Sequence, residues 1–227
     1  MHAATQVLER SPRTPAQPAP RDPLDLLEQF GTTITVERDR QIHGQGDEAE
    51  SCYRVLRGCV RVVSLLEDGR RQIGEFLLPG DLLGFDSAGT HDFAAEAVTE
   101  VVLRRYPRRM VEALAERQLG LSGWLRGVAA VSLRIAHARL LMLGRKTASE
   151  RLAGFLMEMS KRLVRKGEWI ELPMSRTDMA DHLGLTIETV CRLLAHLRRE
   201  GTVDVGRGSI RIMDRVALQQ MASEARH

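Results

Sequence analysis

Residues 175–200, SRTDMADHLGLTIETVCRLLAHLRRE, contain two short amphipathic segments separated by a glycine. In the first segment Met179 and Leu183 fall on one face of a helix, because positions i and i+4 lie together at 3.6 residues per turn. Ser175 and the acidic residue three positions later form a capping-box pattern, which marks a helix start. Gly184 is the residue type that ends helices, since it has no Cβ to oppose a left-handed backbone. The pattern predicts a first helix and a tight turn.

The second segment predicts a helix with two distinct faces. Thr186 is a suitable N-cap, and an acidic residue in the first turn suits the positive end of the helix dipole. One face is an apolar stripe for the core, formed by Val190, Leu193, Leu194 and Leu197. The other face carries Glu188, Cys191 and Arg192 at i, i+3 and i+4. A glutamate accepts from the cytosine amino group, and an arginine bonds guanine O6 and N7. Such residues on the N-terminal turns of a second helix are typical of helix-turn-helix proteins that read bases in the major groove.

A short hairpin is predicted directly after this helix. Val203–Val205 and Ile210–Ile212 are β-type runs on either side of the glycine-rich turn at residues 206–208. A helix-turn-helix followed by a hairpin is a winged helix. The alternative interpretation is an amphipathic helix pair with a solvated charged face, which is common for isolated pairs. The hairpin favours the winged helix.

Residues 183–201, LGLTIETVCRLLAHLRREG, resemble the recognition segment of the CRP/FNR family of bacterial transcription regulators. Residues 172–190 are especially similar to its FNR and FixK branches. The family's Glu-x-x-Ser-Arg reading triad falls on Glu188, Cys191 and Arg192, so the chain departs from the pattern at Cys191, where a serine is usual. The resemblance implies a homodimer on a palindrome similar to TTGAT-N4-ATCAA. It also implies transcription activation through contact with RNA polymerase, in low-oxygen or nitrogen-related gene control.

Further DNA contacts are expected around the same segment. Residues near the two helix N-termini are candidates for phosphate contacts: Ser175, Arg176, Thr177 and Thr189. Three arginines are expected to add charge along the DNA backbone: Arg198, Arg199 and Arg207. Cys191 lies near a helix N-terminus beside an arginine, which is typical of reactive thiols. The hypothesis is that its oxidation blocks DNA binding; the alternative is a passive replacement of serine.

At 227 residues, the chain is long enough for two modest domains. No apolar run approaches the ~20 residues of a membrane span, and the N-terminus lacks the apolar core of a secretory signal. Three cysteines, an odd number, do not indicate a disulfide framework, so a reducing cytoplasm is expected.

Residues 1–144 contain 18 arginines and 19 acidic residues, whereas residues 145–227 contain 15 basic and 11 acidic residues. The basic excess lies in the half with the helix-turn-helix, which suits phosphate contact.

The predicted fold class is α+β, in four parts. Residues 1–23 hold five of the eight prolines and are expected to be a disordered tail. Residues 24–118 are expected to be an effector domain of the β-roll type that binds cyclic nucleotides in relatives, residues 119–144 a dimerisation helix and hinge, and residues 145–227 the winged helix-turn-helix domain. The β-rich runs behind the second part are Thr32–Val36, Cys52–Leu56, Val60–Leu66, Gln72–Leu78, Phe93–Val98 and Val101–Arg105. The basic run at residues 104–109, RRYPRR, is interpreted as a solvated connector rather than a DNA patch.

A two-helix seam is predicted for the long helix at residues 121–143. Its apolar positions step by four and three residues, the spacing of a coiled coil: Leu121, Leu125, Val128, Ile135 and Met142. Ser132 and Arg139 interrupt the seam. The family resemblance favours a parallel homodimer, and the alternative is a single helix packed on its own β-domain.

No cofactor or metal is expected. The tail has no cysteine for an iron–sulfur cluster, and Cys52 and Cys59 are not at a cluster spacing. Residues 93–96 replace the Arg-Ser pair that holds the phosphate in cyclic-AMP-binding relatives, so a cyclic phosphate would be unpaired. His43 and His91 are interpreted as surface residues rather than haem or metal ligands. A nucleophile–base pair and a phosphate loop are also missing, so an enzyme is not expected. The alternative is a ligand-gated regulator that binds haem, nitric oxide or a small molecule in the β-roll.

Overall fold

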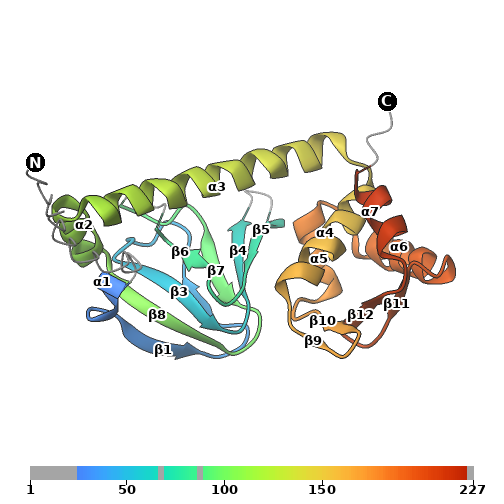
Figure 1. Ribbon diagram of the computed structural model, residues 1–227, viewed down its shortest axis with the longest axis horizontal. Helices are drawn as coiled ribbons and strands as arrows, with labels where there is room; N and C mark the ends of the chain where they lie inside the picture. Colours follow the sequence, from blue (N-terminus) through green and yellow to red (C-terminus); the bar gives the residue numbers. More distant parts are fainter. Residues whose placement is uncertain (1–24, 66–68, 86–88, 224–227) are drawn as a thin grey trace, which may run out of the picture.

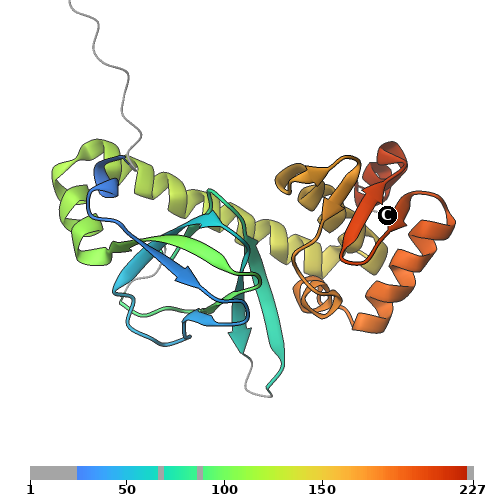
Figure 2. The same ribbon diagram turned by 90° about the horizontal axis from the view of Figure 1, so that it is seen from below.

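The computed structural model describes residues 25–65, 69–85 and 89–223. The predicted disordered tail therefore lies outside the described residues. Figures 1 and 2 show a β-rich N-terminal domain, a long helix that runs along it, and a C-terminal domain at the far end of that helix. This is the α+β arrangement that the sequence predicts.

The N-terminal domain is a roll of two antiparallel four-stranded sheets, with orders β1-β8-β3-β6 and β2-β7-β4-β5. Its strands are β1 (Thr32–Val36), β2 (Gln41–His43), β3 (Ser51–Arg57), β4 (Val60–Leu65), β5 (Arg71–Leu77), β6 (Leu82–Leu83), β7 (Ala94–Ala97) and β8 (Val101–Pro107). Alternate residues point inward, and Val55, Val60 and Leu103 are fully buried between the sheets. Six strands match the predicted runs. The sequence missed β2 and β6, because strands of three and two residues are too short to show an alternating pattern.

One helix precedes the strands of the roll in the chain, and two helices follow them. They are α1 (Asp25–Glu28), α2 (Arg108–Arg117) and α3 (Leu119–Arg145). Leu27, Tyr106, Val111 and Leu121 form a small core where these helices meet the roll. Of the described helices, α3 is long and apolar enough to cross a membrane by length and composition. Its first turns pack on the roll instead, and Figure 1 shows it lying along both domains.

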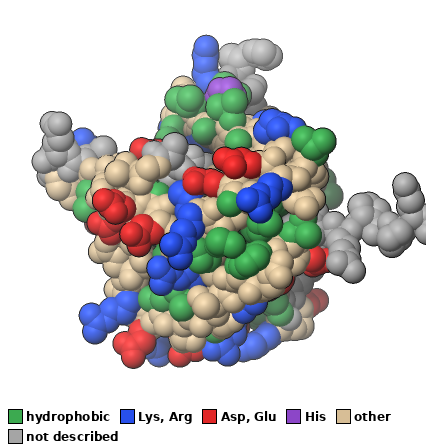
Figure 3. All heavy atoms as spheres, turned by 90° about the vertical axis from the view of Figure 1, so that its left-hand side faces the viewer, with side chains coloured by type: hydrophobic (Ala, Val, Ile, Leu, Met, Phe, Trp, Pro, Cys, Tyr) green, Lys and Arg blue, Asp and Glu red, His purple; other side chains and the backbone are tan. Residues whose placement is uncertain are grey.

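The basic run at residues 104–109 is not a solvated connector, so that interpretation is wrong. Arg104 forms an ion pair with Glu28 at 2.9 Å, and Arg105 donates to Ser51 Oγ at 2.8 Å. Arg108 donates to two backbone carbonyls, those of Ala49 and Gly84. These guanidinium groups join β8 and α2 to neighbouring segments. On this end of the molecule, charged side chains of both signs surround hydrophobic ones (Figure 3).

The C-terminal domain combines four helices with a small sheet of order β11-β12-β10-β9. Its elements are α4 (Ala148–Arg162), β9 (Arg165–Lys166), β10 (Trp169–Glu171), α5 (Arg176–Leu183), α6 (Ile187–Arg199), β11 (Val203–Val205), β12 (Ser209–Ile212) and α7 (Arg215–Ser223). Helix α4 ends at Arg162, and residues 165–166 then pair with β10. Leu152, Leu156 and Leu183 are fully buried at the centre of this domain.

Candidate nucleic-acid interface

The two helices of the motif begin and end where the sequence predicts. Ser175 Oγ accepts from the Asp178 N–H, and the Asp178 carboxylate accepts from the Ser175 N–H, both at 3.0 Å, which completes the capping box. Gly184 follows α5 with φ +62°, a left-handed conformation that glycine adopts without steric cost. Thr186 Oγ1 accepts from the Thr189 N–H at 3.2 Å and caps α6. These local interactions fix the turn between the helices.

Helix α6 separates its buried and exposed faces as its periodicity predicts. Val190, Leu194 and Leu197 are buried in the domain core, and Leu193 is half-buried against it. The three predicted base-reading residues lie together on the opposite face, and all three are exposed: Glu188, Cys191 and Arg192. The helix therefore presents an acceptor, a thiol and a bidentate donor from its N-terminal turns.

The predicted phosphate contacts occupy three places around this face. Ser175, Arg176 and Thr177 lie at the N-terminus of α5, where Ser175 and Thr177 are exposed and Arg176 is half-buried. Thr189 lies in the first turn of α6, and its hydroxyl is 3.1 Å from the hydroxyl of Thr186. The remaining predicted residues are exposed arginines near the C-terminus of α6 and in the β11–β12 turn: Arg198, Arg199 and Arg207.

A groove of about 720 Å³ joins several of these residues. It is lined by Arg176 from α5, Cys191, Arg198 and Arg199 from α6, and Val205 from β11, among others. Its described lining contains three arginines and no acidic residue, so the groove is electropositive. The sequence did not predict that these residues share a groove, because the crossing of α5 and α6 decides which side chains meet.

The cysteines differ in accessibility. Cys52 and Cys59 are buried in the roll, whereas Cys191 is exposed. Burial raises the pKa of the Cys59 thiol to about 12, which keeps it protonated. Cys191 is therefore the cysteine that reagents in solution can reach.

A second cavity, of about 260 Å³, lies between the roll and α3. His43 and His91 are among its lining residues, and both are buried, so the interpretation of these histidines as surface residues is wrong. Their rings stack with centroids 3.5 Å apart and an interplanar angle of 14°. This places the imidazoles face to face rather than around a shared metal ion. The described residues contain no group of three or more His, Cys, Asp or Glu side chains arranged for a metal.

The cavity residues do not fit a cyclic nucleotide. Arg139 from α3 is the one arginine in the described lining, and its guanidinium donates to His182 Nδ1 in α5 at 2.9 Å. Phe85 packs its ring against Trp124 and Tyr106 at 5.7 and 6.3 Å. A cyclic phosphate in this cavity would have no roll arginine to pair with, and a buried unpaired phosphate is unfavourable.

Of the residues predicted for a two-helix seam, Leu121, Leu125 and Met142 pack on their own chain, whereas Ile135 is 39% exposed. Leu121 has 0% exposure within the monomer, and Leu125 packs against the same small core. Val128 and Ile135 line the cavity under α3, and Met142 packs against the core of the C-terminal domain. A coiled coil and a helix that packs on its own domain share the same four-and-three spacing, and the two-helix seam stays a prediction. The opposite face of α3 exposes Leu133 and Leu140, which are 58% and 70% exposed.

The roll, the long helix and the winged helix with its exposed reading face together define a DNA-binding transcription regulator. Residues 33–118 match the family model for a cyclic nucleotide-binding domain, and residues 150–221 match the model for a Crp-like helix-turn-helix domain. The chain belongs to the CRP/FNR family of transcription regulators.

Its relatives include FixK proteins. The chain is 42% identical over 169 residues to the nitrogen fixation regulation protein FixK of Rhizobium meliloti, which covers 74% of this chain and 76% of the relative. It is 38% identical over 206 residues to FixK of Azorhizobium caulinodans, covering 88% of this chain and 83% of the relative. The solved structure of FixK2 from Bradyrhizobium japonicum superposes with a TM-score of 0.83 at 41% identity, covering 86% of this chain and 99% of that one. These relatives are transcription regulators rather than enzymes.

Proposed function

We propose that the protein is a homodimeric transcription activator that binds a palindrome similar to TTGAT-N4-ATCAA without a ligand or cofactor. One observation carries this proposal: Glu188, Cys191 and Arg192 are exposed together on the first turns of α6. Glutamate and arginine at these positions have the chemistry to read the single G·C pair of each TTGAT half-site in the major groove, since glutamate accepts from cytosine N4 and arginine donates to guanine O6 and N7. Arg176, Arg198, Arg199 and Arg207 surround this face and contribute phosphate contacts.

The exposed face of α3 supports the homodimer. Leu133 and Leu140 are seven residues apart, so they lie two turns apart on one side of the helix. Two such helices pack together by covering these leucines. A two-fold dimer places two copies of α6 about one DNA turn apart, ~34–36 Å, and so requires a palindromic site.

The relatives support the biological setting. The relatives from Rhizobium meliloti and Azorhizobium caulinodans are both named nitrogen fixation regulation proteins. We therefore place this regulator in the cytoplasm, where it acts with RNA polymerase in low-oxygen or nitrogen-related gene control.

A ligand-gated regulator is the second candidate, favoured by the 260 Å³ cavity under α3. That volume lies just below the range of ordinary small-molecule sites, ~300–1,000 Å³. Arg139 lines the cavity and also bonds α5, so an occupant there has a route to the DNA-binding domain.

The test is DNA binding by purified, air-exposed protein without additives, with and without a thiol reductant. The duplexes are TTGAT-N4-ATCAA and a scrambled control of the same composition. Tight binding to the palindrome alone, in both redox states, supports the ligand-independent activator. Binding only under reducing conditions assigns a thiol switch, with Cys191 as its site. Equal binding to both duplexes contradicts the proposed specificity, and no binding in either state favours the ligand-gated alternative.

A further inference from the structure

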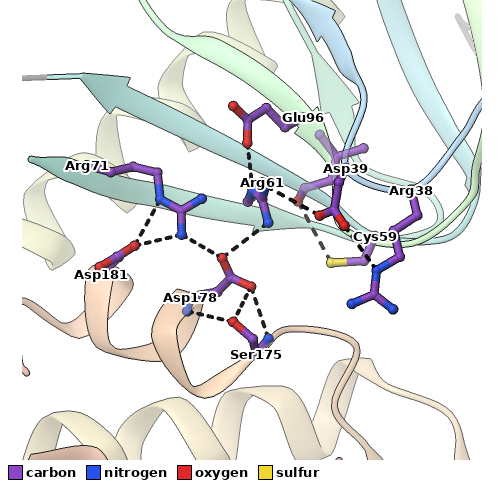
Figure 4. A network of polar contacts seen from close by, with 10 residues as sticks. Arg38, Asp39, Cys59, Arg61, Arg71, Glu96, Ser175, Asp178 and Asp181 are labelled. Atoms are coloured by element: carbon purple, nitrogen blue, oxygen red, sulfur yellow. Dashed lines mark hydrogen bonds and ion pairs between the residues drawn. The ribbon is translucent and has the colours of Figure 1, made fainter. Parts of the chain in front are cut away.

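The DNA-binding domain is joined to the roll by a group of charged side chains between β4–β5 and α5. Figure 4 shows Arg61 and Arg71 reaching from the roll toward two carboxylates on α5. Arg61 contacts Asp178 at 3.2 Å, and Arg71 contacts Asp178 at 2.9 Å and Asp181 at 2.8 Å. We call Arg61, Arg71, Glu96, Asp178 and Asp181 the interdomain ion-pair cluster.

The centre of this cluster is withdrawn from water. The side chains of Asp178 and Arg61 are 5% and 12% exposed, and those of Arg71 and Asp181 are about a quarter exposed. Arg61 is held in place from its own domain, since its Nε donates to Glu96 at 2.7 Å. Ion pairs with this much burial and several bonds per charge have a defined geometry, unlike mobile surface pairs. The cluster therefore specifies one position of α5 on the roll.

Asp178 connects the docking contact to the helix-turn-helix itself. The carboxylate that pairs with both arginines also caps α5 by accepting from the Ser175 N–H. Gln72 adds a bond from β5 by donating to the backbone carbonyl of Asp181 at 2.5 Å. The roll thus contacts the backbone and the cap of α5, so a displacement of the roll is passed to the first helix of the motif.

Two further contacts lie beside the cluster. The Phe76 ring of β5 packs on His182 and on Phe155, with centroid distances of 5.0 and 6.2 Å. Arg162 of α4 forms an ion pair with Asp81 of the roll. The covalent link between α3 and α4 is only residues 146–147, so these side-chain contacts decide the angle between the domains.

Docking and DNA binding use different faces of the motif. The side chains of Asp178, Asp181 and His182 face the roll, whereas Ser175 and Thr177 at the start of α5 are exposed. The base-reading face of α6 is exposed as well. The docked arrangement therefore leaves the DNA-binding surface open.

We propose that the interdomain ion-pair cluster holds the DNA-binding domain in the orientation that binds DNA, so that this orientation needs no bound ligand. This inference rests on the proposed function for the identity of the DNA site. A dimer whose two reading helices are already placed binds a palindrome more tightly than one whose domains move freely, because only the competent fraction binds. Arg71 and Asp181 act as positioning residues within the interdomain ion-pair cluster.

The experiment compares Arg71→Glu, Asp181→Arg and the double variant in the full-length protein. These positions are chosen because Asp178 also caps α5, and its replacement would damage the helix start. Arg57→Glu is the matched control, since Arg57 and Glu100 form an exposed ion pair between two residues of the roll. Binding to the palindromic duplex is measured by fluorescence anisotropy, and the radius of gyration without DNA by X-ray scattering. Sedimentation confirms that each variant keeps the parent's oligomeric state.

Each single variant is expected to lose about tenfold in affinity and to expand in solution, while Arg57→Glu matches the parent. The double variant restores an attractive pair and is expected to bind more tightly, and to be more compact, than either single variant. Single variants that match the parent in both measurements would overturn the proposal, and so would a double variant that is no tighter than the singles. If the parent itself fails to bind the duplex, the proposed function has failed, and the scattering comparison still decides whether the cluster fixes the domains.

Discussion

At the residue scale, Arg192 and Arg199 lie on one helix but are expected to contribute differently to DNA binding. Arg192 is exposed on the same face as Glu188 near the start of α6, whereas Arg199 lies at its C-terminal end beside the electropositive groove. Arg192→Ala should weaken binding to the palindrome by about 1–3 kcal/mol and relax base preference at one position of each half-site. The measurement is anisotropy with duplexes substituted at single positions.

Arg199→Ala is the matched control for this substitution. Removal of a phosphate contact should weaken all duplexes about equally and lower the dependence of log K on log salt by about 0.9. Unchanged discrimination between palindrome and scrambled duplex in Arg192→Ala would remove Arg192 from the base readers.

Cys191 is expected to be the one cysteine that an alkylating reagent modifies in the folded protein. Cys52 and Cys59 are buried, and burial raises the pKa of Cys59 to about 12, so neither presents a reactive thiolate. Mass spectrometry after brief N-ethylmaleimide treatment should show a single adduct on Cys191, with further adducts only after denaturation. The modified protein should lose DNA binding, because the adduct projects from the reading face of α6.

Cys191→Ser separates this effect from general damage, since it removes the thiol and keeps a small polar side chain. The variant should bind DNA before and after treatment. Loss of binding in treated Cys191→Ser protein would place the sensitive group elsewhere.

Sequence reasoning at this scale succeeded where partners are close in the chain. The cap of α5 joins residues three apart, and a three-residue pattern is visible in any sequence. The same Asp178 carboxylate pairs with Arg61, which is 117 positions away in the chain. No local sequence pattern indicates such a contact. His43 and His91 show the same limit, because their stacking depends on how two turn-rich segments of the roll are brought together.

At the scale of elements, periodicity identified the faces of helices but not what covers them. For α6 the apolar stripe is buried and the face with Glu188, Cys191 and Arg192 is exposed, as the spacing predicts. For α3 the predicted stripe begins with Leu121 and Leu125, which pack on the chain's own roll, because that contact and a coiled coil share the same repeat. Leu133 and Leu140, on the other face of α3, are also seven residues apart. The sequence shows both stripes, and only the position of the roll decides which of them is buried within the chain.

The exposed stripe of α3 leads to a prediction about assembly. Leu133→Glu with Leu140→Glu should convert the proposed dimer to a monomer, because four carboxylates would lie in one apolar contact without partners. Sedimentation velocity measures the change, and circular dichroism should show that the helix content is kept. DNA binding should fall with the loss of the second half-site contact.

Leu65→Glu is the control, since Leu65 is an exposed leucine (59%) at the end of β4 and does not belong to α3. This variant should remain dimeric. A Leu133→Glu, Leu140→Glu protein that sediments like the parent would mean that the chains associate through another surface.

At the scale of the whole molecule, the two domains share a core and a set of charges, so they are expected to unfold together. Ile73 and Phe76 of the roll belong to the same buried cluster as Phe155 and Leu156 of the DNA-binding domain. His182 lies in this contact, donated to by Arg139 and packed on two phenylalanine rings. Its protonation state therefore reports on the docked arrangement.

Burial, together with the adjacent positive charge of Arg139, lowers the pKa of His182 from 6.5 to about 3. Between these values the unfolded chain binds a proton that the folded chain does not, so the free energy of unfolding falls as the pH falls below 6.5. Lowering the pH from about 7.5 to about 5.5 should remove about 1.4 kcal/mol of stability through His182 alone. His182→Gln keeps an acceptor for Arg139 but does not titrate, so urea unfolding should show a smaller loss by that amount. His137→Gln, at an exposed histidine of α3, is the control for replacing a histidine at another position. Equal loss in the parent and in His182→Gln would mean that His182 is not buried in solution, and that the domains are not docked as they are in this structure.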